Sequence, residues 1–171
     1  MAVISLDDIK AFLRYDTGDT SNDTALNIIL AGGQSWIERY TNHLFTYREV
    51  VDNPKAIGDF YDLRWKPADI DSVYIDYLDS LYALQTFSAI ATYDINGIVR
   101  IVPTVAFPTG SVGINVTYNA GYSDVDDIPP VMLHALSVYA AMSDEERAGG
   151  MNYGWEAMKN LLIDFHTPVI V

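Results

Sequence analysis

Residues 116–136 read VTYNAGYSDVDDIPPVMLHAL, and they join the end of an expected strand to the start of an expected helix. Apolar and polar residues alternate at first, Gly121 permits a turn, and three aspartates precede Pro129 and Pro130. Proline is tolerated in the first turn of a helix because the first N–H groups there have no partner within the helix. The stretch therefore predicts a junction between a β layer and a helical layer.

The three aspartates at this helix entrance are Asp124, Asp126 and Asp127. A calcium loop would need oxygen ligands at fixed alternating positions, a central glycine and a distal glutamate, and the two prolines interrupt that pattern. Aspartates before a helix accept hydrogen bonds from its free N–H groups and complement its dipole. We therefore expect them to cap the following helix rather than to bind a metal.

Upstream of the junction, alternation with a period of two extends over residues 44–122 and predicts antiparallel strands. Asp79 and Ser80 mark a hairpin turn between two of these segments. Asn96 followed by Gly97, between two extended segments, is the strongest short signal for a second hairpin. We expect a small antiparallel sheet with one face exposed to water.

Helical spacing flanks the strands on both sides. Ser5 is placed as the N-cap of a first helix, and a second helix ends at Asn42. Gly32 and Gly33 lie inside the second helix, where each glycine costs about 1 kcal/mol relative to alanine. We expect either a close approach to another helix or a kink at this pair.

Two more helices follow the junction, the second of which stops before Pro168. The buried stripe of the first comprises Met132, Leu133, Leu136, Tyr139 and Ala140, and the apolar face of the second comprises Trp155, Met158, Leu161, Leu162 and Phe165. The predicted fold class is therefore α+β, a helical bundle from the N- and C-terminal helices with an inserted small antiparallel β-sheet. We expect a single domain over residues 1–171, with N-terminal helices in 1–43, the β insertion in 44–122, and the C-terminal helices and tail in 123–171.

The chain has 171 residues, no cysteine, 10 lysines and arginines and 23 acidic residues, for a formal net charge of −13. The absence of cysteine excludes disulfides, thiolate metal sites and cysteine nucleophiles. The acidic balance disfavours gripping of a phosphate backbone, apart from a local basic patch formed by Arg48, Lys55, Arg64 and Lys66. Because there is no signal-peptide pattern and no run of about 20 apolar residues, we expect a soluble protein made in a cytoplasm.

No pattern in the sequence indicates catalysis or a cofactor. His43, His134 and His166 fall in different elements and are expected at the surface rather than as metal ligands. Nucleophile motifs and phosphate-binding glycine loops are absent, and Glu145 and Glu146 are neighbours that cannot face each other on a helix. We expect a protein that has no cofactor and no metal and is not an enzyme.

Tyrosine is abundant, with 12 in the chain, and many of these fall in the region of the strands. Large rings with a polar tip often line ligand or protein interfaces. They are also ordinary cross-strand packing partners within a sheet. Both interpretations stay open for the set Tyr61, Tyr74, Tyr77, Tyr82, Tyr93, Tyr118 and Tyr122.

The order of these parts resembles the head–tail connector (adaptor, head-completion) proteins of tailed bacteriophages, in particular the longer members with a β insertion. Residues 4–16 are similar to the family's opening helix, with its acidic pair and Leu-Arg ending, and residues 37–41 read IERYT. Residues 116–136 follow the order of Val-Thr-Tyr, Gly-Tyr, an acidic stretch, Ile-Pro and a helix with which the insertion ends. Residues 161–168, LLIDFHTP, are similar to the Leu-Leu-x-x-Tyr-Arg ending, with Phe165 and His166 in place of Tyr-Arg.

The resemblance implies a structural virion protein of the neck, at the head–tail interface, made in the host cytoplasm. Its subunits would form a homo-oligomeric ring, usually a dodecamer, docked under the portal protein. Such a ring extends the DNA channel, lets DNA pass without specific binding, and offers an attachment surface to the stopper or tail-completion protein. The alternative function is a tail-associated or host-surface binding module that uses the tyrosine-rich sheet.

The last helix and the tail are the expected partner interface, because an apolar end beyond a helix stop is costly to leave in water. The residues expected to contact the portal or a neighbouring subunit are Met158, Leu161, Leu162, Phe165, His166, Pro168, Val169, Ile170 and Val171. The other possibility is that the tail folds back on its own subunit.

Overall fold

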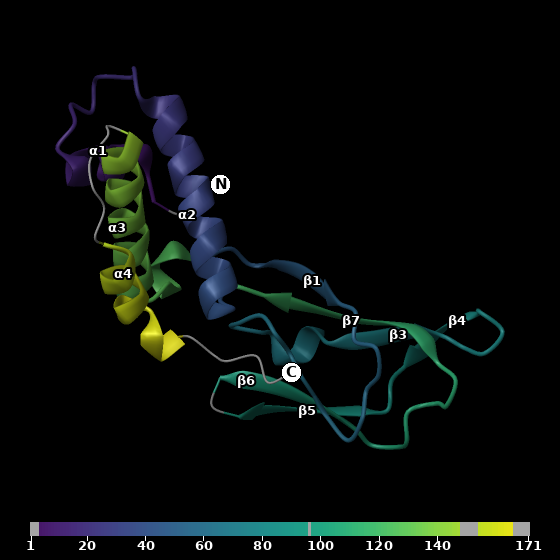
Figure 1. The fold of residues 1–171 in the computed structure, drawn as a ribbon. Coiled ribbons are helices and arrows are strands. Elements are labelled where there is room, and N and C mark those ends of the chain that lie inside the picture. The colour runs from purple at the N-terminus through teal and green to yellow at the C-terminus, as the bar shows by residue number, and fades with distance from the viewer. Residues whose placement is uncertain (1–3, 96, 148–153, 166–171) are drawn as a thin grey trace. The chain divides into compact units, whose positions relative to one another are not determined.

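The protein has an α+β fold in the computed structural model, which describes residues 4–95, 97–147 and 154–165 (Figure 1). The chain divides into two compact units. The helical unit comprises residues 1–45 and 124–171, and the sheet unit comprises residues 46–123. The predicted fold class, helices from both ends of the chain with an antiparallel β region inserted between them, is confirmed.

The described helices of the helical unit are α1 (Leu6–Leu13), α2 (Asp23–Thr41), α3 (Pro130–Arg147) and α4 (Trp155–Leu161). Two predicted boundaries are confirmed, because Ser5 Oγ accepts a hydrogen bond from Asp8 N at 3.1 Å and Asn42 ends α2 with a φ of 57°. The last helix is shorter than predicted. Leu162 N donates to the carbonyl three residues back, and a 3₁₀ turn over Ile163–Phe165 follows. Among the described helices, none is both long and apolar enough to span a membrane.

α2 packs against α3 at Gly33. A Cβ atom on Gly33 would lie 2.6 Å from Tyr139 Cδ1 and 2.7 Å from Leu136 Cδ1, which is closer than such atoms can approach. On Gly32 the nearest atom would be Tyr139 Oη at 3.6 Å, an ordinary contact. Of the two expectations for this pair, close approach is confirmed at Gly33, and α2 continues as a helix through both glycines.

Apolar side chains from all of these helices fill the core of the helical unit. On α3 the predicted stripe is buried at Met132, Leu136 and Ala140, whereas Leu133 and Tyr139 are half-buried. The fully or almost fully buried partners from the other elements include Ile9, Leu26, Leu30, Ile37, Leu44, Met158 and Leu162. Burial of these side chains holds the helices together without any cross-link.

Within the described residues, the sheet unit contains two antiparallel sheets, and the prediction of a single sheet was wrong. Strands β1 (Arg48–Asp52), β7 (Val112–Ala120), β3 (Tyr74–Leu78) and β4 (Leu84–Phe87) form the first sheet in that order, and β2 (Tyr61–Asp62), β6 (Ile98–Pro103) and β5 (Ile90–Ile95) form the second. Only Ser88 and Ala89 separate β4 from β5, and the β5–β6 hairpin then pairs with β2. Alternation shows that a segment is extended, whereas the choice of partner depends on contacts distant in the sequence. A 3₁₀ turn over Ile70–Ser72 precedes β3.

Both predicted hairpins are present. Ile95 pairs with Ile98 in the β5–β6 hairpin, and Gly97 has the positive φ, 76°, that a tight turn requires. Asn96 lies outside the described residues. In the β3–β4 hairpin, Leu78 pairs with Leu84, so the turn takes residues 79–83 and is longer than the predicted two residues.

The two ends of the sheet unit run side by side. β1 pairs with β7 along its length, from Arg48 opposite Ala120 onward, and Tyr47 N donates to Tyr122 O at 2.9 Å. Gly121, between the end of β7 and Tyr122, has a φ of 111°, and a Cβ atom there would lie 2.3 Å from Thr46 O. Glycine is therefore required for the chain to turn at the end of β7.

After this turn, Asp124 caps a 3₁₀ helix. Asp124 Oδ1 accepts a hydrogen bond from Asp126 N at 3.1 Å, which makes Asp124 the N-cap of the 3₁₀ helix Val125–Asp127. α3 begins only at Pro130, where the Pro129 carbonyl accepts from Met132 N at 2.8 Å. Capping is thus confirmed for Asp124, whose target is the 3₁₀ helix, and Ile128 and Pro129 separate that helix from α3.

Candidate interaction surfaces

The β3–β4 hairpin ends in exposed apolar side chains, and we name Leu81, Tyr82, Leu84 and Val112 the hairpin surface. Leu81 is 84% exposed, Tyr82 77%, Leu84 67% and Val112 45%. The strand register places Leu84 and Val112 on either side of Leu78, on one face of the first sheet. Contiguous exposed apolar side chains on a folded protein indicate contact with a partner.

The turn that presents Leu81 and Tyr82 is held by one carboxylate. Asp79 Oδ1 accepts hydrogen bonds from Ala83 N at 3.0 Å and Leu81 N at 2.8 Å, and Oδ2 accepts from Gln85 Nε2 at 3.3 Å. These hydrogen bonds hold the pKa of Asp79 below its usual range, and those from the backbone N–H groups have the largest effect. Tyr82 keeps a φ of 60°, a left-handed conformation that costs a non-glycine residue about 1–2 kcal/mol. The turn therefore has a defined conformation, which holds the apolar side chains at its tip in place.

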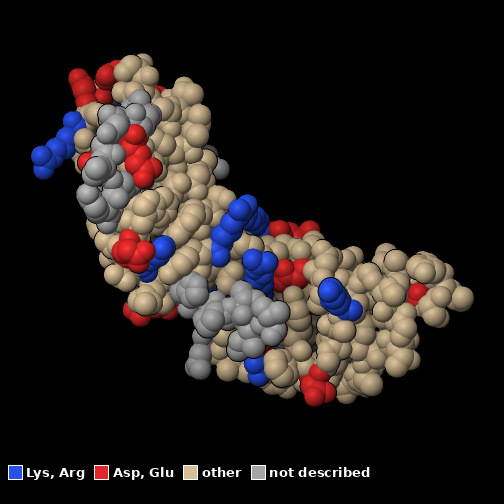
Figure 2. Space-filling view, in the orientation of Figure 1, with Lys and Arg blue, Asp and Glu red and all other residues tan. Residues whose placement is uncertain are grey.

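Charge is unevenly distributed over the chain. The helical unit has 14 acidic and five basic residues, for a net charge of −9, whereas the sheet unit has nine and five, for −4. Residues 80–93 and 101–123 contain no acidic or basic residue at all. Figure 2 shows the end of the sheet unit at which Figure 1 places β4 as almost entirely uncharged. The hairpin surface thus lies in the least charged part of the protein.

The two edges of the first sheet differ in the same way. β1 and β4 are its edge strands, since each pairs with one neighbour only in the described residues. Edge strands are usually guarded by charged residues or proline, which prevent pairing with another chain. β1 carries Arg48, Glu49 and Asp52, whereas β4 carries neither charge nor proline. β4 is therefore the unguarded edge.

The tyrosines of the strand region divide into two groups. Tyr118 is fully buried; its hydroxyl donates to Asp52 Oδ2 at 2.8 Å and accepts from Trp65 N at 3.1 Å. Burial, with the nearby charge of Asp52, raises the pKa of Tyr118 far above its ordinary value, and burial and Asp52 raise that of Tyr61 in the same way. Cross-strand packing is thus the role of Tyr118, whereas three members of the predicted set are exposed and can contact a partner: Tyr74, Tyr82 and Tyr93.

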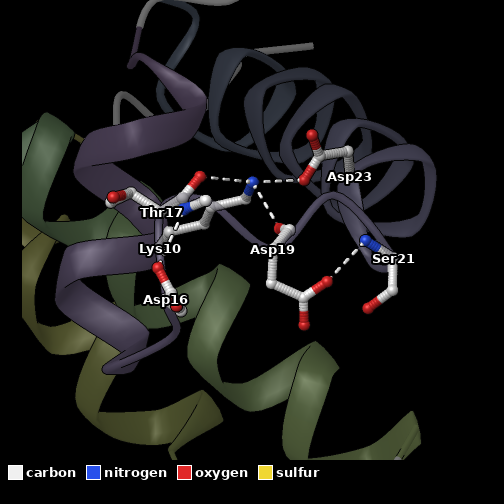
Figure 3. A network of polar contacts seen from close by, with 7 residues as sticks. Lys10, Asp16, Thr17, Asp19, Ser21 and Asp23 are labelled. Atoms are coloured by element: carbon white, nitrogen blue, oxygen red, sulfur yellow. Dashed lines mark hydrogen bonds and ion pairs between the residues drawn. The ribbon is translucent and has the colours of Figure 1, made fainter.

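The helical unit contains a buried cation that the sequence gave no reason to expect. Lys10 on α1 is 2% exposed, and its Nζ lies 2.5 Å from Asp23 Oδ1 at the start of α2 (Figure 3). Nζ also donates to the carbonyls of Asp19 at 2.8 Å and Thr17 at 3.4 Å. The loop between α1 and α2 is shaped by Asp19, whose Oδ1 accepts from Ser21 N at 2.9 Å. This network fixes the start of α2 to α1, and its role is structural.

The four predicted basic residues do not all project as free surface charges. Arg48 lies on β1, and Lys55, Arg64 and Lys66 lie outside the strands. The Arg64 guanidinium lies 5.0 Å from the centroid of the Trp65 ring, and burial lowers the pKa of Lys66. Arg64 and Lys66 therefore pack against the sheet unit to which they belong.

The described histidines lie apart from one another, each beside an aromatic ring. His134 is exposed on α3 with its ring 6.4 Å from that of Phe12, and the His43 ring lies 5.5 Å from that of Phe165. His166 lies outside the described residues. Across residues 4–95, 97–147 and 154–165, no group of three or more histidine, aspartate or glutamate side chains is arranged to hold a metal ion.

The predicted terminal interface falls partly inside the core. Met158 and Leu162 are fully buried within the helical unit, whereas Leu161 and Phe165 are half-buried. His166, Pro168, Val169, Ile170 and Val171 lie outside the described residues. Ile163, which the sequence pattern did not single out, is a largely exposed apolar side chain of the described part of this segment, at 62%.

No family model matches the sequence, and no curated protein matches it. Solved structures of gene transfer agent (GTA) particles, however, contain chains of similar fold. A chain in the neck of the empty GTA particle, computed with C6 symmetry, has a TM-score of 0.77 at 18% identity, over 99% of this chain and 92% of that chain. A chain in the virion of the native particle has a TM-score of 0.78 at 20% identity, with the same coverage.

A third chain, from the neck of the native GTA particle computed with C12 symmetry, has a TM-score of 0.71 at 21% identity. The match covers all of this chain and 94% of that one. The protein shares their fold. Because the matches cover nearly the whole length of both partners, the shared architecture includes the helical unit and the inserted sheet unit together.

Proposed function

We propose that this protein is a structural subunit of the neck of a phage-like particle, and specifically a head–tail connector. In this role it docks under the portal, extends the DNA channel and offers an attachment surface to the stopper or tail. The observation that carries the proposal is the likeness of fold, over essentially the whole chain, to chains of GTA particles and their necks. The resemblance of the sequence to phage connector proteins supports it from a separate direction.

The working form of the protein is a ring of twelve copies in the neck of the virion. The GTA neck structures were computed with C6 and C12 symmetry, both of which describe rings around a central axis. Closed rings of this kind use heterologous contacts, in which one patch of each subunit meets a different patch of the next. This role needs binding surfaces and no catalytic chemistry.

The acidic balance suits a channel through which DNA slides without specific binding. Each subunit carries a formal net charge of −13, so a ring of them repels the phosphate backbone on average. Adhesion to DNA would slow the passage of a genome, and repulsion prevents it.

The proposal is tested by mixing the purified protein with portal-bearing, tailless heads of the phage or phage-like particle that encodes it. We expect the protein to sediment with the heads, and electron microscopy to reveal a ring-shaped collar beneath the portal. Circular dichroism first establishes that the chain is folded. A folded protein that does not sediment with the heads would refute the connector role, and it would favour the binding module based on Tyr74, Tyr82 and Tyr93.

The segment after α4 is proposed as one contact of the docked ring, with the portal or with a neighbouring subunit. Deletion of residues 167–171 removes an apolar end that is costly to leave in water. We expect the truncated protein to keep its circular dichroism spectrum and its melting temperature, and to bind heads at least several-fold less than the full chain in the same sedimentation assay. Undiminished attachment argues against this contact, and a lowered melting temperature indicates that the tail packs on its own subunit.

A further inference from the structure

We infer that the hairpin surface is one half of the contact between neighbouring copies of this chain. The inference rests on the proposed ring and adds to it the part of the subunit that meets its neighbour. The tip of the β3–β4 hairpin is the most exposed apolar feature of the described residues, with Leu81 84% and Tyr82 77% exposed. The Asp79 carboxylate fixes the turn, so these side chains are presented at little further cost in conformational entropy.

The distribution of charge favours a second copy of this chain as the partner that contacts the hairpin surface. Two subunits that each carry −13 repel one another, and a ring brings many such charges together. The repulsion is least where the contacting surfaces carry no charge. Residues 80–93, which include the turn after Asp79 and the whole of β4, contain neither acid nor base, and Asp79 at the start of the turn is the acidic residue nearest in the sequence to the tip. A strongly basic partner would instead gain most from the helical unit, whose net charge is −9.

The two edges of the first sheet also favour a second copy of this chain as the partner. β4 exposes an edge without charge or proline, while Leu84, Gln85 and Thr86 are all exposed. β1, the opposite edge, carries three charged residues in five. One open edge and one guarded edge do not fit repeated edge-to-edge stacking, and they do fit a contact in which the hairpin of one copy meets a different surface of the next.

The test places a photo-reactive residue, p-benzoylphenylalanine, at Leu84, and at Val51 on β1 as the matched control. Both side chains are exposed apolar residues on edge strands of the same sheet, at 67% and 49%. The variants are illuminated both as concentrated purified protein and bound to heads, and the products are separated by mass and mapped by mass spectrometry. We expect chain-to-chain products from position 84 at several times the yield from position 51, in at least one of the two samples.

A second pair of variants keeps the test independent of the photo-reactive residue. Leu84→Lys places a guarding charge on the open edge, and Val51→Lys places the same charge on the guarded edge. Both substitutions lie on the surface, so circular dichroism is expected to stay unchanged. We expect Leu84→Lys to reduce collar formation or self-association at least several-fold, and Val51→Lys to leave it unchanged.

The outcomes separate this inference from the connector role. Equal yields from the two positions, products from position 84 with another head protein alone, or no chain-to-chain product in either sample would each overturn the inference. A collar that forms under any of these results leaves the connector role intact. Chain-to-chain products from position 84 without any collar on the heads support the hairpin contact and refute the connector role.

Discussion

Gly121→Ala is expected to destabilise the sheet unit by more than about 3 kcal/mol, because two penalties add at this position. The φ of 111° disfavours any side chain, and the new Cβ would lie 2.3 Å from Thr46 O and 2.6 Å from Thr46 C. These are backbone atoms, so no side-chain rotation relieves the overlap. Since whole domains are stable by about 5–15 kcal/mol, the loss is a large fraction of the total. Urea unfolding followed by circular dichroism and by tryptophan fluorescence measures it.

Gly58→Ala is the matched control for this prediction. Gly58 is exposed, and a Cβ atom there would meet nothing within 4 Å. We expect its unfolding free energy to stay within about 0.5 kcal/mol of that of the parent protein. If the Gly121→Ala and Gly58→Ala proteins unfold at the same urea concentration, the turn at the end of β7 does not require glycine.

Asp23→Ala is expected to destabilise the helical unit by about 2–4 kcal/mol. Removing one partner of a buried ion pair typically costs about 3–5 kcal/mol, and the 27% exposure of Asp23 reduces that figure. The variant removes the ion partner of Lys10, whose side chain is 2% exposed in the parent protein, and among the described residues it leaves the carbonyls of Thr17 and Asp19 as hydrogen-bond partners. Within the described residues no hydrogen bond reaches the buried Asp23 Oδ1, so the ion pair with Lys10 is what satisfies it. Thermal and urea unfolding measure the effect.

Two further variants show whether burial of the cation is the cause. Lys10→Met keeps the packing of the side-chain stem and leaves a carboxylate that water can reach, so its cost is expected to be smaller than that of Asp23→Ala. Glu156→Ala breaks the exposed pair with Lys159, whose atoms lie 2.9 Å apart, and is expected to cost less than about 0.5 kcal/mol. Equal losses for Asp23→Ala and Glu156→Ala would contradict the structural role of Lys10.

Local signals in the sequence predicted the elements that depend on near neighbours. The Ser5 cap and the end of α2 at Asn42 follow from residue type and spacing, and the close approach at Gly33 is one of the two alternatives that the glycine pair left open. The pairing of the β5–β6 hairpin with β2, through β6, could not be predicted, because it depends on where the chain goes after two connecting residues. The burial of Lys10 was missed for the same reason: lysine is rarely buried, and the loop that encloses it has no periodic pattern.

The candidate surfaces were harder to predict than the fold. Met158 and Leu162 matched the pattern of an apolar interface, yet both are buried within the helical unit. A pattern of apolar residues does not distinguish a side chain covered by its own subunit from one covered by a partner. The hairpin surface had a usable signal, namely Leu81 and Tyr82 in a turn, where small and polar residues are the rule.

The pairing of β1 with β7 makes the sheet unit a self-contained cassette. Its first and last strands are neighbours, and Tyr47 and Tyr122 are joined by a hydrogen bond just where the chain enters and leaves. A segment whose two ends are adjacent can be inserted at the place where a short loop would otherwise connect α2 and α3. The sequence between α2 and α3 can therefore diversify, in evolution or by engineering, while the packing of Gly33 against Leu136 and Tyr139 stays unchanged.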